Sequence, residues 1–566
     1  MLLWYIAGTL AALWLLRQLW LRLLLSRAKH PSLAGHARMA GRIVRFIRFY
    51  DYDETRFFNA DDAPAEIVAA RRAGFMQLAQ LYAQRFPKSA ALAREVARGL
   101  SDLQFTMRYR VPFQFSRMVR QSLPGGTFLE SSCGVTVQDV DGNRLYDVAG
   151  SYGVNLFGYD FYKECIERGA QRVRALGPVL GAYHPLLADN VRRLREISGH
   201  DEVSFHMSGT EAVMQAVRLA RYHTRRRYLV RFCGAYHGWW GDVQPGVGNP
   251  LPPDATYTLK DLDALSLRVL RTRRDIACVL VNPVQAMHPN ASAPADSGLI
   301  DSGRTARFDR AAYAAWLKEL RAVCTERGIV LIFDEVFVGF RLARGGAQEY
   351  FGVRADLVTY GKSLGGGLPV GVVCGRHELM KRYDEERPAD VCLARGTFNS
   401  HPYVMGAMNE FLTRLDGEPI RALYRDLDAV WDRRAAELNA RLKAVDLPVQ
   451  VANLSSIWTF DYLRPSRYNW MFQYHLRAQG LALSWVGTGR LIFSLNYSDA
   501  DFAAVADRVV AAAEAMRRDG WWWSGPSLTN KAIRRRVLRE LFQAWWSTSS
   551  IGSTSSPRSS ASGAPQ

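Results

Sequence analysis

A single lysine, Lys362, stands between an apolar run and three consecutive glycines in the segment LVTYGKSLGGGLPVGVVCG. An amine at the end of a buried strand has its pKa lowered by desolvation, which makes it nucleophilic towards carbonyl groups. The glycines at 365–367 would let the backbone approach a ligand closely. We therefore expect Lys362 to attach an aldehyde cofactor, the alternative being a lysine on a solvated loop.

Two adjacent carboxylates, Asp334 and Glu335, end the apolar run LIFDE that precedes this lysine. In an open α/β sheet the carboxyl ends of the strands face the ligand crevice, so a carboxylate there is well placed for a ligand. Capping of the next turn is the alternative, and the sequence does not choose between the two acids.

Small hydroxyl residues mark a possible phosphate site in HMSGTEAVMQAVRLAR. Ser208, Gly209 and Thr210 stand where a strand-like run ends and a helix begins. Backbone N–H groups and hydroxyls beside the positive end of a helix favour a phosphate, although an ordinary helix cap without a ligand is the alternative.

Two further segments fit the same ligand. In CGAYHGWW, Tyr236 and His237 lie in a glycine-flanked turn where an aromatic ring could stack on a flat cofactor. In RGTFNSHP, Thr397 is a second candidate phosphate donor. Phosphate cradle, strand-end aspartate and strand-end lysine are the parts needed to hold a phosphorylated pyridine aldehyde.

The elements that must position these residues are short apolar runs alternating with helical stretches, which predict an α/β fold with a large, mostly parallel sheet. The strand candidates are YLVRF, ACVLVNPV, IVLIFDE and DLVTYG, and GVTVQDVDGNRLYDVAG predicts a hairpin. We expect a helical extension over 31–110 and a body over 111–520. The body divides into a cofactor domain, about 160–405, and a smaller α+β domain from 111–159 and 406–520. Seven scattered cysteines without a C-x-x-C pair indicate neither disulfides nor a metal site.

The charge of +19 is concentrated near the chain ends, in RQLWLRLLLSRAKH and NKAIRRRVLRELFQ. Basic residues beside apolar ones favour an anionic membrane surface over nucleic acid, so we expect no nucleic-acid partner. Residues 1–26 are interpreted as an uncleaved anchor, with the arginines after it placing the body on the cytoplasmic side. A buried or bilayer-lying helix is the alternative. Residues 527–545 predict a basic amphipathic helix, and 547–566 a disordered tail.

From residue 113 to 520 the chain resembles the class III, fold-type I pyridoxal-phosphate aminotransferases, and most closely the glutamate-1-semialdehyde aminomutases. The resemblance rests on DVDGNRLYDVAGSYGVNLFGYD, SGTEAVMQAVRLAR, GAYHGWW, LIFDEVFVGFR, GKSLGGGLPVGVVCGR and GTFNSHP, in family order. It implies pyridoxal 5'-phosphate as the cofactor. It also implies that Lys362 bonds to the cofactor and moves the proton, while Asp334 pairs with the pyridine nitrogen.

The same resemblance implies the remaining contacts. Gly209 and Thr210 would bind the phosphate, and Tyr236 would cover the ring. Thr397 would reach the phosphate of the neighbouring subunit, which implies a homodimer.

Several positions depart from the family pattern. Asn282 stands where a glutamate is expected, Phe337 where many members have glutamine, and WVGTGRLIFSLNYSD replaces the aminomutase F-E-A-G-F region. Arg490 in that stretch is a candidate for a substrate carboxylate, with a solvent-facing arginine as the alternative. Ser151 and Tyr152 are further substrate candidates.

The sequence thus predicts amino-group transfer between a donor and an aldehyde or ketone. The anchor and the aromatic pair Trp239 and Trp240 suggest a lipid-like or carrier-bound substrate. An aminomutase, racemase or decarboxylase would use the same lysine and aspartate, and a catalytically inactive membrane-tethered scaffold is the alternative from another class.

Overall fold

The computed structural model describes residues 1–31, 35–124, 128–244, 248–251, 253–283, 308–484 and 489–551. Its largest sheet has the order β4-β10-β9-β8-β7-β5-β6. The pairs β5–β6, β5–β7, β7–β8 and β8–β9 are parallel, whereas β10 is antiparallel to both neighbours. The strands are β4 (Glu202–His206), β5 (Tyr228–Phe232), β6 (Thr256–Leu259), β7 (Ile276–Val281), β8 (Val330–Asp334), β9 (Leu357–Gly361) and β10 (Gly371–Gly375). The mostly parallel sheet and all four strand candidates are confirmed.

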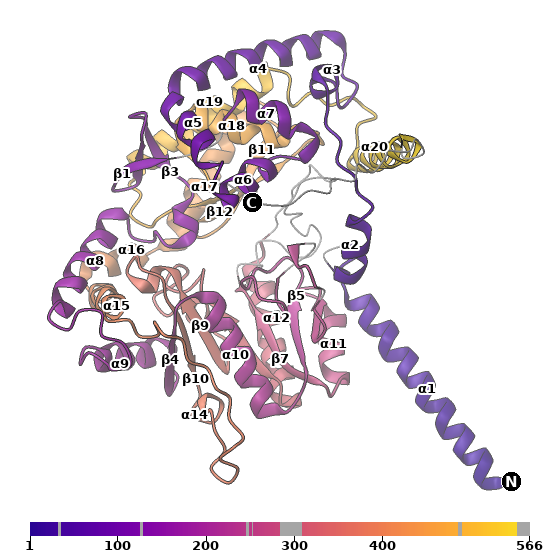
Figure 1. Ribbon diagram of the computed structural model, residues 1–566, viewed down its shortest axis with the longest axis vertical. Helices are drawn as coiled ribbons and strands as arrows, with labels where there is room; N and C mark the ends of the chain where they lie inside the picture. The colour runs from indigo at the N-terminus through magenta and orange to yellow at the C-terminus, as the bar shows by residue number, and fades with distance from the viewer. Residues whose placement is uncertain are drawn as a thin grey trace, which may run out of the picture.

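Helices connect and cover these strands (Figure 1). Strands β7, β8, β9 and β10 are buried along their whole length, which explains their apolar runs. The crossover helices α10 (Gly209–Thr224) and α12 (Arg310–Arg327) begin at caps whose side chains accept a backbone N–H, Ser208 and Asp309. Smaller helices of this part are α11 (Ala264–Thr272), α13 (Gly346–Phe351) and α14 (His377–Met380).

Two small sheets lie above the large one in Figure 1. One joins β1 (Leu129–Cys133), β2 (Thr136–Asp139), β3 (Arg144–Asp147) and β13 (Leu481–Ala482); the other joins β11 (Val449–Leu454), β12 (Ile457–Tyr462) and β14 (Arg490–Ile492). Strands β2 and β3 form the predicted antiparallel hairpin. Helices α17 (Leu427–Ala444), α18 (Phe472–Ala478) and α19 (Asp499–Arg518) accompany these small sheets. Helices α8 (Tyr159–Val173), α9 (Leu187–Ser198), α15 (Pro402–Leu415) and α16 (Glu418–Tyr424) form a separate group at the β4 end of the large sheet (Figure 1).

The helices between residues 37 and 122 pack on the rest of the chain, and the last of them lies within the predicted body. They are α2 (Ala37–Val44), α3 (Glu54–Phe58), α4 (Ala65–Arg85), α5 (Pro87–Val96), α6 (Ser101–Tyr109) and α7 (Ser116–Ser122). In α4, the fully buried Arg71 pairs with Asp61 at 2.7 Å and donates from Nε to the carbonyl of Gly520. This buried charge pair fixes the extension against the end of α19.

The first and last helices project from the body. Helix α1 (Leu2–Ala28) is long and apolar enough to cross a membrane, and only its last turns are packed, at Leu24 and Ala28. Helix α20 (Asn530–Ile551) covers the predicted C-terminal helix and continues past residue 546, so the first residues of the predicted tail are helical. Once a helix has formed, each further residue adds a hydrogen bond without a new nucleation cost. Residues 552–566 lie outside the described part of the chain.

Candidate active site

Four strand ends bring the candidate residues to one edge of the large sheet. Strands β4, β5, β8 and β9 run in the same direction, and each is followed by a candidate segment. A methyl group at Gly361, the last residue of β9, would lie 3.7 Å from the Cα of Gly209 at the start of α10. The lysine and the phosphate candidates therefore occupy neighbouring positions.

Asp334 and His237 form the centre of this edge. The Nδ1 of His237 lies 2.7 Å from the Oδ2 of Asp334, and both side chains are buried. The other carboxylate oxygen, Oδ1, accepts the N–H of Val336 at 3.1 Å and lies 3.4 Å from the Thr359 hydroxyl. These contacts hold the carboxylate in one orientation at the end of β8.

Glu335 is committed to another task. Its two oxygens accept the backbone N–H groups of Ala347 at 2.6 Å and Gln348 at 3.0 Å, in the first turn of α13. Burial raises the pKa of Glu335 to about 8, against the effect of these two hydrogen bonds. The structure thus resolves the ambiguity between the adjacent acids, because only Asp334 faces the candidate site.

Lys362 follows β9 directly in a left-handed backbone conformation, with φ of 44°. Because such a conformation is unfavourable for a residue with a Cβ, it marks a backbone held by its surroundings. The Nζ lies 5.8 Å from the centre of the Phe337 ring, and a methyl group at Gly153 would lie 3.5 Å from the lysine Cδ. Burial and the positive charge of Arg341 lower the pKa of Lys362, while Asp334 opposes that shift.

Arg341 is a buried residue of this region that the sequence-based reasoning did not single out. Its guanidinium donates to the carbonyls of Asn155 at 3.1 Å and Phe493 at 2.6 Å, and reaches that of Gly153 at 3.4 Å. Burial lowers its pKa to about 10. The only signal in the sequence is an arginine that follows directly on the apolar and glycine residues of DEVFVGFR. Its partners come from distant segments and could not be read from that signal.

The turn at residues 150–153 carries Ser151 and Tyr152 beside the lysine. Both have positive φ, 45° and 57°, and the Ser151 hydroxyl lies 3.0 Å from that of Tyr159. The carbonyl of Gly153 accepts the Ser363 hydroxyl at 3.1 Å. The structure therefore places these two substrate candidates next to the lysine-bearing segment, with Tyr152 half exposed.

The phosphate candidates are held by a cap and by a close turn. Ser208 caps α10 by accepting the N–H of Glu211 at 3.3 Å. A methyl group at Gly238 would lie 2.5 Å from the Oγ1 of Thr210, so the turn after β5 rests directly on the first turn of α10. Tyr236 in that turn is 57% exposed, and its carbonyl is 3.4 Å from the amide nitrogen of Asn282.

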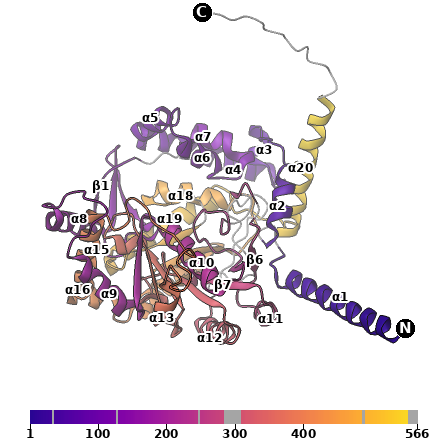
Figure 2. The ribbon, with the colours of Figure 1, turned by 60° about the horizontal axis from the view of Figure 1, so that its bottom comes forward.

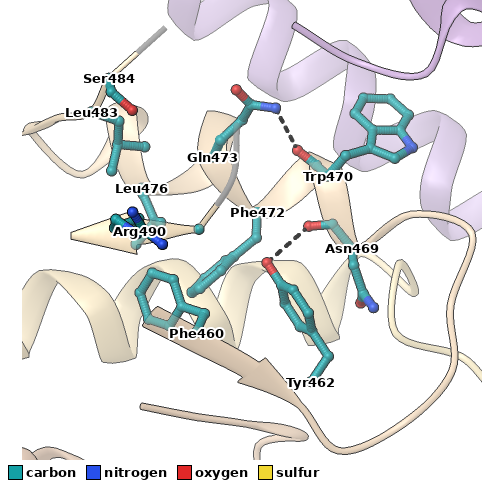
Figure 3. A pocket seen from close by; sticks show the side chains of 11 residues that line it. Phe460, Tyr462, Asn469, Trp470, Phe472, Gln473, Leu476, Leu483, Ser484 and Arg490 are labelled. Carbon is teal, nitrogen blue, oxygen red and sulfur yellow. Dashed lines mark hydrogen bonds between the residues drawn. The ribbon is translucent and has the colours of Figure 1, made fainter. Parts of the chain in front are cut away.

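Two candidates are not brought to this group by any described contact. Thr397 is exposed between α14 and α15. Arg490 lines a pocket formed mainly by β12 and α18, with Phe460 and Phe472 among its walls (Figure 3). The free space there is about 20 Å³, room for about one water molecule rather than a substrate carboxylate. None of the residues around Lys362 is among the described lining residues of this pocket.

The arrangement fits a phosphorylated pyridine aldehyde. The Nε2 of His237 is buried and has no hydrogen-bond partner among the described residues, which marks a polar position awaiting a ligand. An amine whose pKa is lowered by burial, a fixed carboxylate and a helix N-terminus with hydroxyls are the three contacts that the aldehyde, the pyridine nitrogen and the phosphate require.

Comparison with known proteins supports the same conclusion. A family model of the class-III aminotransferases matches residues 118–242 and 309–513. A glutamate-1-semialdehyde 2,1-aminomutase of Geotalea daltonii is 30% identical over 444 residues, covering 70% of this chain and 96% of the relative. A structure described as a transaminase with PLP bound is 25% identical, with a TM-score of 0.60 over 76% of this chain and 97% of that one.

A glutamate-1-semialdehyde aminomutase structure from Pseudomonas aeruginosa has a TM-score of 0.63 at 17% identity, covering 79% of this chain and 99% of that one, and shows the shared fold. The resemblance seen in the sequence motifs is confirmed, as are the cofactor and the enzyme class. The chain belongs to the class-III aminotransferases, which are pyridoxal-phosphate-dependent transaminases and aminomutases.

Proposed function

We propose that this enzyme moves an amino group between a donor amine and an aldehyde or ketone, with Lys362 as the group that carries the proton. The observation that supports this is that a buried lysine with a lowered pKa and the fixed carboxylate of Asp334 lie at the same edge of the large sheet. When bound, pyridoxal phosphate supplies the electron sink that stabilises the carbanion. Asp334 holds the positive charge of the ring nitrogen, and Lys362 accepts and returns the substrate proton.

Transamination consists of two half-reactions, and the first of them can be tested by adding the amino donor without an acceptor. The full-length protein loaded with cofactor should release pyridoxamine phosphate when it receives an amino donor alone. A racemase or decarboxylase would return its cofactor unchanged. An aminomutase is the second candidate, because curated relatives carry that name; it would convert a single substrate into its isomer without net loss of the amino group.

The Lys362→Ala protein is the control for both reactions. It should bind pyridoxal phosphate without forming a bond that borohydride can reduce, and turnover should fall by about 10⁴-fold. A variant that kept its activity, or a reduced adduct mapped to another lysine, would contradict the proposal. A protein that never binds the cofactor would favour the scaffold alternative.

The proposal includes a homodimer at the cytoplasmic face of a membrane, tethered by α1. Within it, Thr397 of one subunit would reach the phosphate bound by the other, which accounts for its exposed position in the single chain. The described window of α1 that is apolar enough to span is only 6% buried in the protein. Sedimentation of the detergent-solubilised enzyme would test the dimer, and flotation with vesicles would test the tether.

We further propose that the substrate is lipid-like or carrier-bound. Trp239 is 75% exposed beside Tyr236, and Phe337 provides an apolar surface at the lysine. The comparison is the kcat/KM of an amine with a long alkyl chain against that of its short homologue. Each CH₂ group that is buried should raise the kcat/KM of the long-chain amine by the equivalent of about 0.8 kcal/mol. Equal kcat/KM values for the two amines would contradict the proposal.

A further inference from the structure

Two segments far apart in the sequence expose apolar side chains on the same side of the molecule. In α20 these are Leu538, Phe542 and Trp546, which are 56%, 62% and 65% exposed. Their spacing of four residues places them on one face of the helix. In α2 and the residues after it they are Met39, Ile43, Phe46 and Phe49, which are 47%, 38%, 66% and 57% exposed. We call these seven residues the platform.

The opposite face of α20 is firmly seated. Ile533 and Val537 are each 3% exposed. Glu540 pairs with Arg467 at 2.9 Å and accepts the Tyr52 hydroxyl at 2.6 Å. The outward face is therefore presented by a fixed helix and is not the result of a helix left unpacked.

The same contacts bring the two halves of the platform together. Tyr50 and Tyr52, which follow the N-terminal half, both donate to Glu540 of α20. Figures 1 and 2 show α2 and α20 on the same side of the body, which is also the side where α1 joins it. The backbone N–H of Lys260 donates to the carbonyl of Ala28 at 2.9 Å, and Arg268 lies 5.3 Å from the Trp20 ring, so that end of α1 is fixed on α11.

Basic residues surround the apolar stripe. Arg535 and Arg539 lie on the exposed face of α20 next to Leu538, and Arg42 and Arg45 accompany Ile43 in the N-terminal half. A second copy of this surface would bring arginines against arginines, which is unfavourable. An anionic bilayer offers both the apolar interior and the negative headgroups that this combination requires.

We propose that the platform rests on the surface of an anionic membrane, beside the point where α1 enters it. This extends the proposed tether: α1 holds the enzyme to the bilayer, and the platform sets which face of the enzyme meets it. Exposed apolar areas of this kind on a soluble surface mark an interaction site.

A fluorophore on the platform tests this in the full-length enzyme. The nitrobenzoxadiazole label is placed at Leu538→Cys in a background that carries Cys133→Ser, since Cys133 is the one exposed cysteine in the described part of the chain. The matched control is Glu196→Cys, an exposed position on α9. Both views, Figures 1 and 2, show α9 on the side of the molecule away from α20. Vesicles of phosphatidylcholine alone are compared with vesicles that also contain phosphatidylglycerol.

We expect a blue shift at position 538 with the anionic vesicles and none at position 196. Arg535→Gln combined with Arg539→Gln should raise the vesicle concentration that gives half of the shift by roughly tenfold or more.

Protein that floats with both kinds of vesicle but shows no blue shift at position 538 is still held by α1, and this result overturns the platform. A blue shift at position 538 with anionic vesicles, in a protein that does not float with neutral vesicles, supports the platform and contradicts the tether by α1. Binding to neither overturns both, and a concentration-dependent shift without vesicles identifies a second copy as the partner and also overturns the platform.

Discussion

The edge of the large sheet and the platform use charge in opposite ways. At the sheet edge, Asp334 and Arg341 are buried, and each has partners within the chain. On the platform, Arg535 and Arg539 are exposed beside exposed apolar side chains. A buried charge has a large effect because its environment has a low dielectric constant, whereas an exposed charge is screened by water and salt. Substitutions at the first region should therefore act on chemistry, and those at the second on association.

After the loss of Lys362 itself, the largest effect is expected from Asp334→Asn. The amide keeps the shape of the side chain but loses the negative charge that would face the pyridine nitrogen in the proposed site, so turnover should fall by about 10²–10³-fold. Steady-state kinetics of the cofactor-loaded enzyme would measure this.

The control is the neighbouring acid. Glu335→Gln removes one acceptor from the first turn of α13 and should lower thermal stability, with cofactor binding kept. Equal losses of turnover in the two variants would contradict the separate roles of these carboxylates.

The sequence predicted this edge well because the relevant information is local. A buried strand followed by a polar residue is visible in the chain for Asp334, Lys362 and Ser208, and parallel strands place their carboxyl ends together. What it could not predict depends on contacts between distant segments. The Arg341 guanidinium joins carbonyls at residues 155 and 493, and Arg490 proved to line a pocket with room for about one water. The family resemblance already pointed to Asp334, but without it the choice between Asp334 and Glu335 needed the position of α13.

The next largest effect, on stability, is expected at Glu540, whose contacts hold α20 against the rest of the protein. Although burial opposes ionisation, hydrogen bonds from Arg467, Tyr52 and Arg56 lower the pKa of Glu540 to about 2. Glu540→Gln leaves the Arg467 charge without its partner and should cost about 2–3 kcal/mol. This cost should appear as local opening of α20, measured by limited proteolysis.

The pH dependence of these contacts follows from the direction of the shift. A carboxylate with a lowered pKa in the folded protein stabilises it above its ordinary pKa of 4.5, and this stabilisation is lost as the pH falls from there towards 2. The variant should lack this dependence. Glu418→Gln, at an exposed pair with Arg425, should change stability by less than about 0.5 kcal/mol.

A smaller effect is expected from Arg341→Met, near the lysine. Loss of the positive charge that lowers the pKa of Lys362 should raise that pKa, leaving less neutral amine at pH 7. Attachment of pyridoxal phosphate should slow by about tenfold at pH 7, and its pH profile should move to higher pH. Arg341→Lys keeps a charge but loses the fork of hydrogen bonds. A profile that moves equally in both variants would assign Arg341 a structural role alone.

The smallest effect on stability is expected on the platform. Two adjacent residues of α20 lie on opposite faces of this helix and allow a direct comparison. Val537 is 3% exposed and packs inward, whereas Leu538 is 56% exposed. Val537→Ser should destabilise the docking of α20 by about 2 kcal/mol, because it removes apolar contacts and buries a hydroxyl. Leu538→Ser should change stability by no more than about 0.5 kcal/mol, since its side chain has water on most sides. Thermal unfolding in detergent would compare them. A clear loss of stability for Leu538→Ser would mean that the outward face of α20 already packs on the enzyme. The platform would then resemble the edge of the large sheet, whose side chains contact other parts of the same chain, and the comparison between the two regions would fail.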